Sequence, residues 1–168
     1  MSETPPNPNG AMPNDPATAP SMRVLAQYVK DLSFENPKAP ASFQTETAPN
    51  MEVNVDVQAR GLNTDQYEVE LSVAARAMQG EEALFVVETT YAGVFEIKNV
   101  PREQLEMVMV VECPRLLFPF LRQIVADATR NGNYPPLLME PIDFLGIYAA
   151  NAERAKQQGG AVEPTAQA

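Results

Sequence analysis

Histidine is absent from this sequence of 168 residues, tryptophan is also missing, and cysteine occurs once. Without histidine the chain lacks the commonest general base and the commonest metal ligand, and every catalytic triad that uses histidine is excluded. A single cysteine cannot form an intramolecular disulfide and is compatible with a reducing compartment. Carboxylate chemistry remains open, but an enzyme is the less favoured class. We predict no catalytic residue, no metal site and no cofactor.

Basic residues are also few, with 12 Lys and Arg against 22 Asp and Glu, which gives a net charge of −10. Nucleic-acid binding needs clustered Lys and Arg, so this balance argues against it and favours a basic partner. No run approaches the ~18 apolar residues of a membrane span. The first 21 residues lack the basic and apolar regions of a signal peptide. The sequence therefore predicts no nucleic-acid partner and no direct membrane insertion.

One domain with two tails is expected at this length. Residues 1–21 hold six of the 16 prolines and no Lys or Arg. Such a segment cannot bury enough apolar surface to offset its ordering entropy, so it is predicted to be a disordered tail. Residues 157–168 are rich in Gly, Gln and Ala and are interpreted in the same way. The folded domain is therefore expected over residues 22–156.

What the sequence has in quantity is strict alternation of apolar and polar residues, which is typical of strands with one face on a core. Strands are predicted at residues 25–35, 51–60, 67–78 and 83–97. Short turns join the last three strands in an antiparallel meander, and the longer first connection permits a Greek-key placement of the first strand. The alternation separates two groups in that first strand: Tyr28, Leu32 and Phe34 against Asp31, Ser33 and Glu35.

The acidic charge is concentrated in this first half of the domain. Residues 22–97 contain 12 acidic and 5 basic side chains, whereas residues 98–156 contain 7 of each. The predicted sheet therefore carries an acidic surface, which suggests an electrostatic docking face.

The second half changes to a helical period. A helix is predicted to begin at Pro101, because proline is favoured in a first turn. The apolar run from Met107 to Val111 is also compatible with a strand. Pro114 disfavours α geometry at Cys113, so a break is expected there before a second helix that ends near Asn131. Gly132 is expected to supply a left-handed cap to that helix.

The end of the domain is predicted to be a third helix. After a proline-rich connector, Asp143 is expected to cap a helix that runs to about Lys156, with Phe144, Ile147 and Tyr148 on one side. The predicted fold class is thus α+β, with a Greek-key-like four-stranded antiparallel sheet packed with two to three helices.

Separated blocks of this sequence resemble SecB, the bacterial protein-export chaperone family. The blocks occur in the order expected for that family and together span about residues 24–156. They are residues 28–40 (YVKDLSFENPKAP), 81–88 (EEALFVVE), 93–97 (GVFEI), 113–120 (CPRLLFPF) and 130–137 (RNGNYPPL). Any one block alone would be weak, but three separated regions in the right order make the resemblance specific.

The resemblance implies a cytoplasmic, ATP-independent chaperone that assembles as a dimer-of-dimers homotetramer. Such a chaperone binds unfolded precursor proteins and hands them to the SecA motor of the export pathway. Two features depart from the family pattern. The proline-rich N-terminal extension is longer than the family needs, and no tryptophan accompanies Phe43 in the first connection, where many relatives have one.

The resemblance also assigns a motor-binding set to the acidic strands. Asp31, Glu35 and Glu88 match the acidic positions that contact the zinc-binding C-terminal end of SecA, and Val86 takes the apolar position among them. The spacing agrees, because residues two or four apart share a strand face. From the residues alone, a solvated sheet face is the favoured interpretation; the resemblance reverses that preference.

Four aromatic residues are predicted, by analogy with the family, to contact client segments. They are Phe43, Tyr134, Phe144 and Tyr148. A groove between the long first connection and the last helix would receive apolar segments, since aromatic rings offer a large contact area at little conformational cost. Ordinary core packing is the alternative, and for Phe144 the two interpretations are equally weighted.

A further apolar set is predicted to form the oligomer interface, with core packing as the alternative. Its members are Phe85, Val87, Tyr91, Leu117, Leu121 and Ile124. Both faces of the strand at residues 83–97 are rather apolar, which a single protomer would cover poorly, so the sequence itself favours an oligomer.

Two other functions remain open at this point. The chain is an adaptor if its acidic sheet docks one folded partner and no client groove exists. A carboxylate enzyme would need two acidic groups that converge in a pocket, and the sequence offers no such pair.

Overall fold

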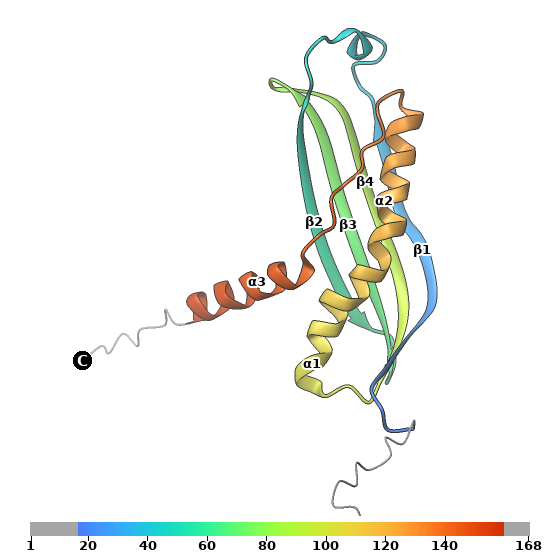
Figure 1. Ribbon diagram of the computed structural model, residues 1–168, viewed down its shortest axis with the longest axis vertical. Coiled ribbons are helices and arrows are strands. Elements are labelled where there is room, and N and C mark those ends of the chain that lie inside the picture. Colours follow the sequence, from blue (N-terminus) through green and yellow to red (C-terminus); the bar gives the residue numbers. More distant parts are fainter. Residues whose placement is uncertain (1–16, 160–168) are drawn as a thin grey trace, which may run out of the picture.

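A computed structural model describes residues 17–159 of the chain, and it confirms the α+β fold. Four strands form one antiparallel sheet in the order β1-β4-β3-β2 (Figure 1). The strands are β1 (Ser21–Glu35), β2 (Asn50–Gly61), β3 (Gln66–Gln79) and β4 (Glu82–Lys98). Strands β2, β3 and β4 form the predicted meander, and β1 pairs with β4, as the Greek-key expectation requires.

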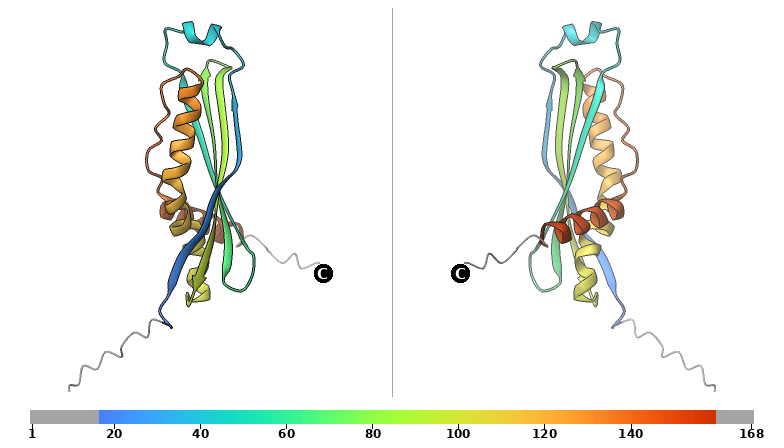
Figure 2. Two further views of the ribbon diagram at one scale, coloured as in Figure 1. Left: turned by 90° about the vertical axis from the view of Figure 1, so that its right-hand side faces the viewer. Right: turned by 90° about the vertical axis from the view of Figure 1, so that its left-hand side faces the viewer.

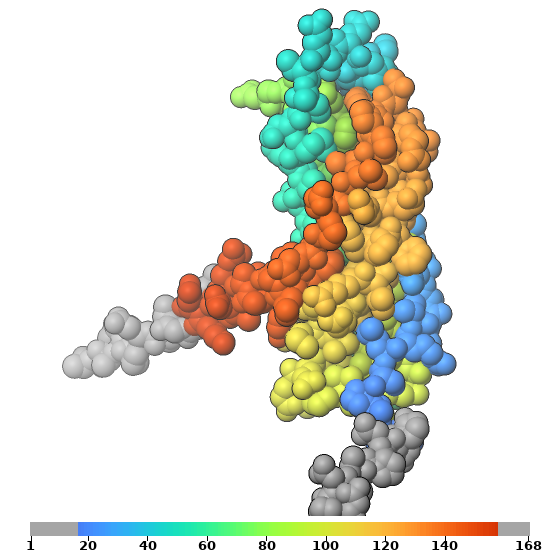
Figure 3. Space-filling model, in the orientation of Figure 1, coloured from blue at the N-terminus to red at the C-terminus, as the bar shows by residue number. Residues whose placement is uncertain are grey.

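The helices lie on one face of this sheet (Figure 2). Helix α2 (Cys113–Asn131) runs along that face, and α3 (Phe144–Gly159) projects sideways past β2 (Figures 1 and 3). The opposite face carries no helix from the described part of the chain, and we call it the open face. This arrangement gives the sheet two chemically different sides.

Both domain boundaries lie further out than the sequence predicts. Strand β1 begins at Ser21, inside the range assigned to the first tail. The side-chain amide of Asn99 donates to the carbonyl oxygens of Ala17 at 3.0 Å and Ala19 at 3.1 Å, which holds the approach to β1. Helix α3 ends at Gly159 rather than near Lys156. The rest of both predicted tails, residues 1–16 and 160–168, lies outside the described residues.

A β-bulge corrects the predicted face pattern of β1. Tyr28 pairs with Ala92 and Asp31 pairs with Thr90, so β1 advances by three residues between these two pairs while β4 advances by two. The extra residue reverses the alternation of even- and odd-numbered side chains across the bulge. Tyr28 therefore shares the open face with Asp31 rather than the core face with Phe34. Simple alternation could not reveal this insertion.

Alternation is right for β3 and β4, whose odd-numbered residues form the core under α2. Val69, Leu71 and Val87 are completely buried there. Gly93 allows α2 to approach closely, because a Cβ at this position would lie 2.9 Å from a methyl carbon of Leu117. In β2 the expected core face is only partly covered: Val53 is 43% exposed.

The predicted break between two helices at Cys113 is wrong. Helix α1 (Arg102–Met107), a π-helical turn η2 (Val108–Glu112) and α2 form one continuous helical run. The Cys113 N–H donates to the carbonyl of Val108, five residues back. This wider turn shifts the hydrogen-bond register just before Pro114, which stands in the first turn of α2, so the proline is accommodated without a break.

The end of α2 also differs from expectation, because Gly132 has a φ of −77° and is not left-handed. The left-handed residue is Asn133, with a φ of 67°. Glycine at 132 is instead needed for close packing, since a Cβ there would lie 2.3 Å from the ring of Phe34. The predicted cap of α3 is confirmed: the Gly146 N–H donates to Oδ1 of Asp143 at 3.0 Å.

Candidate functional site

The first candidate site is an apolar hollow of about 540 Å³ at the end of the sheet near the β3–β4 turn. It lies beneath the 3₁₀ turn η1 (Ala41–Gln44), and we call it the upper hollow. The Tyr134 ring stands between Phe85 and Phe43, with ring centroids 4.7 Å and 5.5 Å away. Phe85 belongs to the buried core, whereas Phe43 is 41% exposed. The hollow is therefore a continuation of the core that opens to solvent.

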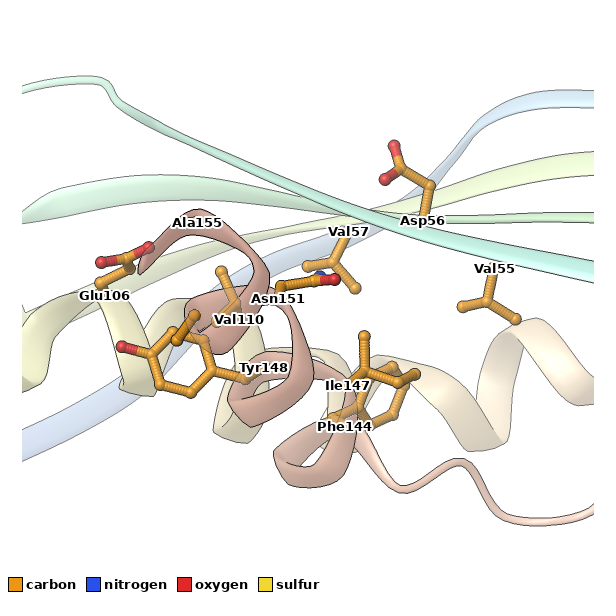
Figure 4. Close-up of a pocket in the computed structure, with 11 residues that line it drawn as sticks. Val55, Asp56, Val57, Glu106, Val110, Phe144, Ile147, Tyr148, Asn151 and Ala155 are labelled. Carbon is orange, nitrogen blue, oxygen red and sulfur yellow. The ribbon is translucent and has the colours of Figure 1, made fainter. Parts of the chain in front are cut away.

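The second candidate site is a hollow of about 480 Å³ between α3, β2 and η2, which we call the lower hollow. Its larger apolar lining residues are Val55, Val57, Val110, Phe144, Ile147 and Tyr148. Val55 and Val57 point toward the helices, whereas Asp56 between them points away (Figure 4). The incompletely covered face of β2 thus becomes one wall of a cavity.

The four predicted client-contact residues do not meet in a single groove of the protomer. Phe43 and Tyr134 line the upper hollow, and Phe144 and Tyr148 line the lower one. Phe144 is 2% exposed and meets Phe118 edge-on at 6.4 Å, so core packing describes it better than client contact. Sequence reasoning missed Val55 and Val57 as lining residues, although their alternation placed them on the helix side.

The predicted motor-binding residues, in contrast, gather on the open face. Glu35 pairs with Val86, and Ser33, two residues back, pairs with Glu88. Asp31 follows on the same side of β1, and the three carboxylates are exposed around the partly buried Val86. We call this set, Asp31, Glu35, Val86 and Glu88, the acidic face.

A cation that sequence reasoning did not single out lies beside the acidic face. Arg76 pairs with Val86 across β3 and β4, and its guanidinium lies 4.0 Å from the Glu88 carboxylate. Both side chains are about half exposed, at 53% and 50%, so water and salt screen their attraction. Arg76 is therefore a weak counter-ion at the border of the acidic face.

A second charged cluster on the open face is centred on Glu68, whose side chain is only 4% exposed. Tyr28 donates to its carboxylate, and Arg60 and Lys30 also contact it. The Tyr28 hydrogen bond is the main cause that lowers the pKa of Glu68 to about 2, and the two cations act in the same direction. Glu68 is therefore ionised at neutral pH and links three strands across the open face.

The predicted interface set is mostly core. Phe85, Val87, Tyr91, Leu117 and Leu121 are all buried within the protomer, and Ile124 is partly buried. The exposed apolar surface lies next to them instead. It is formed by Val29 and Leu32 of β1, at 47% and 48% exposure, and by Leu116 and Phe120 of α2, at 42% and 50%.

The single thiol is also part of the core. Cys113 is fully buried, and burial, together with the nearby Glu112 charge, raises its pKa to about 12. A thiol that stays protonated and inaccessible is a poor nucleophile. Among residues 17–159, no helix is both long and apolar enough to cross a membrane.

A solved structure with the same fold is a SecB-like chaperone of Mycobacterium tuberculosis in complex with a peptide from the HigA1 antitoxin. It matches with a TM-score of 0.60, at 16% sequence identity, over 73% of this chain and 91% of the other. At this identity the likeness establishes the fold of the chain.

The family is established by sequence. Residues 15–155 match the model of the family described as preprotein translocase subunit SecB. The chain is 52% identical to protein-export protein SecB of Rhodopseudomonas palustris strain BisB5, over 91% of this chain and 97% of that relative. It is 48% identical to protein-export protein SecB of Bradyrhizobium diazoefficiens, over 92% and 96% of the two chains. The chain therefore belongs to the SecB family of protein-export chaperones.

Proposed function

We propose that this protein is a cytoplasmic holdase that binds unfolded precursor proteins in its two hollows and delivers them to a SecA-type motor docked on its acidic face. The observation that carries the proposal is the separation of these surfaces by the sheet. Phe85 and Met51 of the upper hollow and Val55 and Val57 of the lower hollow belong to the odd-numbered, helix-side rows of their strands. Glu88 belongs to the opposite row, so client and motor need not compete for one surface.

Client binding is attributed to apolar burial without sequence-specific contacts. Each hollow is within the ~300–1,000 Å³ range of ordinary ligand pockets, so a short apolar segment fills it. One such contact is weak, but several hollows that engage one long chain raise the affinity by ~10²–10⁴ through effective concentration. A folded protein offers no long extended segment and is therefore expected to bind poorly.

The exposed apolar strip of Val29, Leu32, Leu116 and Phe120 supports assembly of this chain into the homotetramer. These side chains come from β1 and α2, and Tyr91 of β4, which pairs with Val29, stacks on Phe120 at 5.9 Å. A second copy of the chain would cover the strip by the same burial that stabilises the core. A sedimentation mass close to the 18.4 kDa of a single chain at micromolar concentration would contradict this part of the proposal.

Motor docking is attributed to the acidic face, which would meet the cationic, zinc-bearing tail of a SecA-type motor. Charge contacts at an interface rim act mainly on the association rate and weaken as salt rises. Val86 would supply the apolar burial at the centre of the contact. In this arrangement Val86→Asp is expected to impair docking as strongly as a charge reversal.

The deciding experiment compares α-lactalbumin in two states as a client. The reduced and alkylated form, which stays unfolded, is expected to bind without nucleotide, and the native form is not. Phe43→Ser and Tyr148→Ser, one in each hollow, are expected to weaken binding while the oligomer persists. Equal affinity for both forms of the client would favour the adaptor alternative, in which the acidic face docks one folded partner.

A further inference from the structure

The hydroxyl of Tyr134 joins parts of the chain that are far apart in sequence. It donates to Oδ1 of Asn36 at 2.8 Å and lies 2.9 Å from Oγ of Ser42 and 3.3 Å from the carbonyl oxygen of Leu84. Asn36 follows β1, Ser42 lies in η1, and Leu84 lies near the start of β4. The side-chain amide of Asn36 also donates to the Gly132 carbonyl at 3.2 Å, beyond the end of α2. Of these residues, Ser42, Leu84 and Tyr134 line the upper hollow.

This cluster helps to hold the turn η1 over the hollow, beside two exposed links that flank the turn, the Lys38–Glu82 ion pair and the Gln79–Thr47 hydrogen bond. Its backbone hydrogen bonds are local, from the Ser42 N–H to Lys38 and from the Phe43 N–H to Pro40, so they shape the turn without attaching it to the sheet. Ser42 is a buried polar residue, at 4% exposure; its hydroxyl lies 2.9 Å from the phenol oxygen and donates a longer hydrogen bond, at 3.4 Å, to Oδ1 of Asn36. Loss of the shorter contact weakens the pairing of a buried hydroxyl, so the Tyr134–Ser42 pair favours one placement of the turn.

The ring and the hydroxyl of Tyr134 therefore do different things. The ring packs on Phe85 in the core and supports Phe43, whereas the hydroxyl fixes the turn that carries Phe43. Since Phe43 is exposed at the rim of the hollow, its position determines how the hollow opens.

We infer that Tyr134 is a positioning residue, whose hydroxyl holds η1 and Phe43 over the upper hollow and so prearranges it for apolar segments. This assignment rests on the proposed client-binding function and refines it, because Tyr134 then acts through η1 rather than by polar contact with the client. A rim that is already ordered spares the client the cost of ordering it on binding.

The test is Tyr134→Phe, which keeps the ring and removes only the hydroxyl. Amide exchange at Ser42 and Phe43 is expected to accelerate at least about fivefold, with exchange in β3 unchanged. The Kd for a fluorescent decapeptide of Leu, Phe, Ser and Thr is expected to rise about 3- to 10-fold, as for the loss of one hydrogen bond. Tyr67→Phe is the matched control, since it also removes a phenol oxygen but lies far from the upper hollow. Met51 of the hollow pairs with Ala77 of β3, and Tyr67 lies ten residues before Ala77 in the same strand.

Ser42→Ala removes the other member of the pair and is expected to reproduce both effects. The double variant should then be little worse than either single one, because each change breaks the same link. Two effects that simply add would overturn the inference, because the hydroxyls would then act independently.

Other outcomes are equally decisive. If Tyr134→Phe raises the Kd while exchange in η1 stays unchanged, the hydroxyl contacts the client and the positioning role is wrong. If exchange accelerates throughout the sheet and the urea midpoint falls in parallel, the hydroxyl is a general structural group and the inference also fails. If the wild-type chain binds no decapeptide, the proposed function fails, and the exchange arm alone still tests the link between Tyr134 and η1.

Discussion

Replacement of Glu68 by glutamine tests whether the open face is stabilised by its buried carboxylate. A pKa lowered from 4.5 to about 2 corresponds to about 3 kcal/mol of folding free energy at neutral pH. Glutamine keeps the size of the side chain but loses the charge that Tyr28, Lys30 and Arg60 contact. Lys30 and Arg60 reach solvent and recover hydration, so we expect Glu68→Gln to lose roughly 2–3 kcal/mol at pH 7.

The pH dependence of this loss follows from the sign of the shift. Because the folded-state pKa of Glu68 lies below its unfolded value, the carboxylate stabilises the folded state fully above pH ~5. That contribution is lost as the pH falls from 4.5 toward 2, when protons bind to the unfolded chain first. The difference between wild type and Glu68→Gln is therefore expected to shrink to less than half at pH 3.

The measurement is urea unfolding, followed by circular dichroism at a fixed protomer concentration, at pH 7 and pH 3. Glu70→Gln is the matched control, since it makes the same change at a neighbouring, more exposed carboxylate that contacts Lys30. We expect it to cost less than about 1 kcal/mol. An equal midpoint for Glu68→Gln and wild type at pH 7, or a difference that persists undiminished at pH 3, would refute the reasoning.

Three further outcomes are expected. Glu88→Lys should weaken docking of a motor tail at least about tenfold while client binding persists, and Arg76→Ala should strengthen docking by freeing Glu88. Both changes are measured by titration at two salt concentrations. An unchanged Kd in both variants would mean that the acidic face is merely solvated. Phe120→Asp should lower the sedimentation mass without unfolding the chain, whereas Val87→Asp, at a position that is completely buried, should unfold it. A Phe120→Asp oligomer of wild-type mass would place the interface elsewhere. The Cys113 thiol should react with Ellman's reagent only slowly in the native protein and at once in urea, and rapid native labelling would contradict its burial and raised pKa.

Sequence patterns predicted those features that depend on neighbouring residues. The alternation in β3 and β4 gave the correct core rows, and Asp143 was correctly identified as the cap of α3 because capping is local. The grouping of Glu35 with Val86 and Glu88 followed from the family resemblance, and the register of β1 against β4 places them on one face. The function of that group stays a prediction.

The features that the sequence did not predict depend on contacts between distant segments. Gly132 was assigned a left-handed cap, but its real constraint is the ring of Phe34, almost a hundred residues away in sequence. Pro114 was expected to interrupt the helix at Cys113. That expectation came from the conformational preference of a residue before proline, which does not reveal that a π-helical turn can precede the proline. Phe43 and Phe144 were placed in one groove, since residue type alone does not reveal which of two hollows a ring lines.

The bulge that brings Tyr28 and Asp31 to one face has a consequence for the rim of the sheet as well. Strand β1 is an edge strand, and its register shifts twice, between Val24 and Ala26 and between Val29 and Asp31. An interrupted edge is a poor template for a further strand, which protects against edge-to-edge aggregation. The other edge, β2, pairs without interruption along its whole length. The sheet thus has one interrupted edge and one regular edge, and we expect a strand of another chain to add less readily at β1 than at β2.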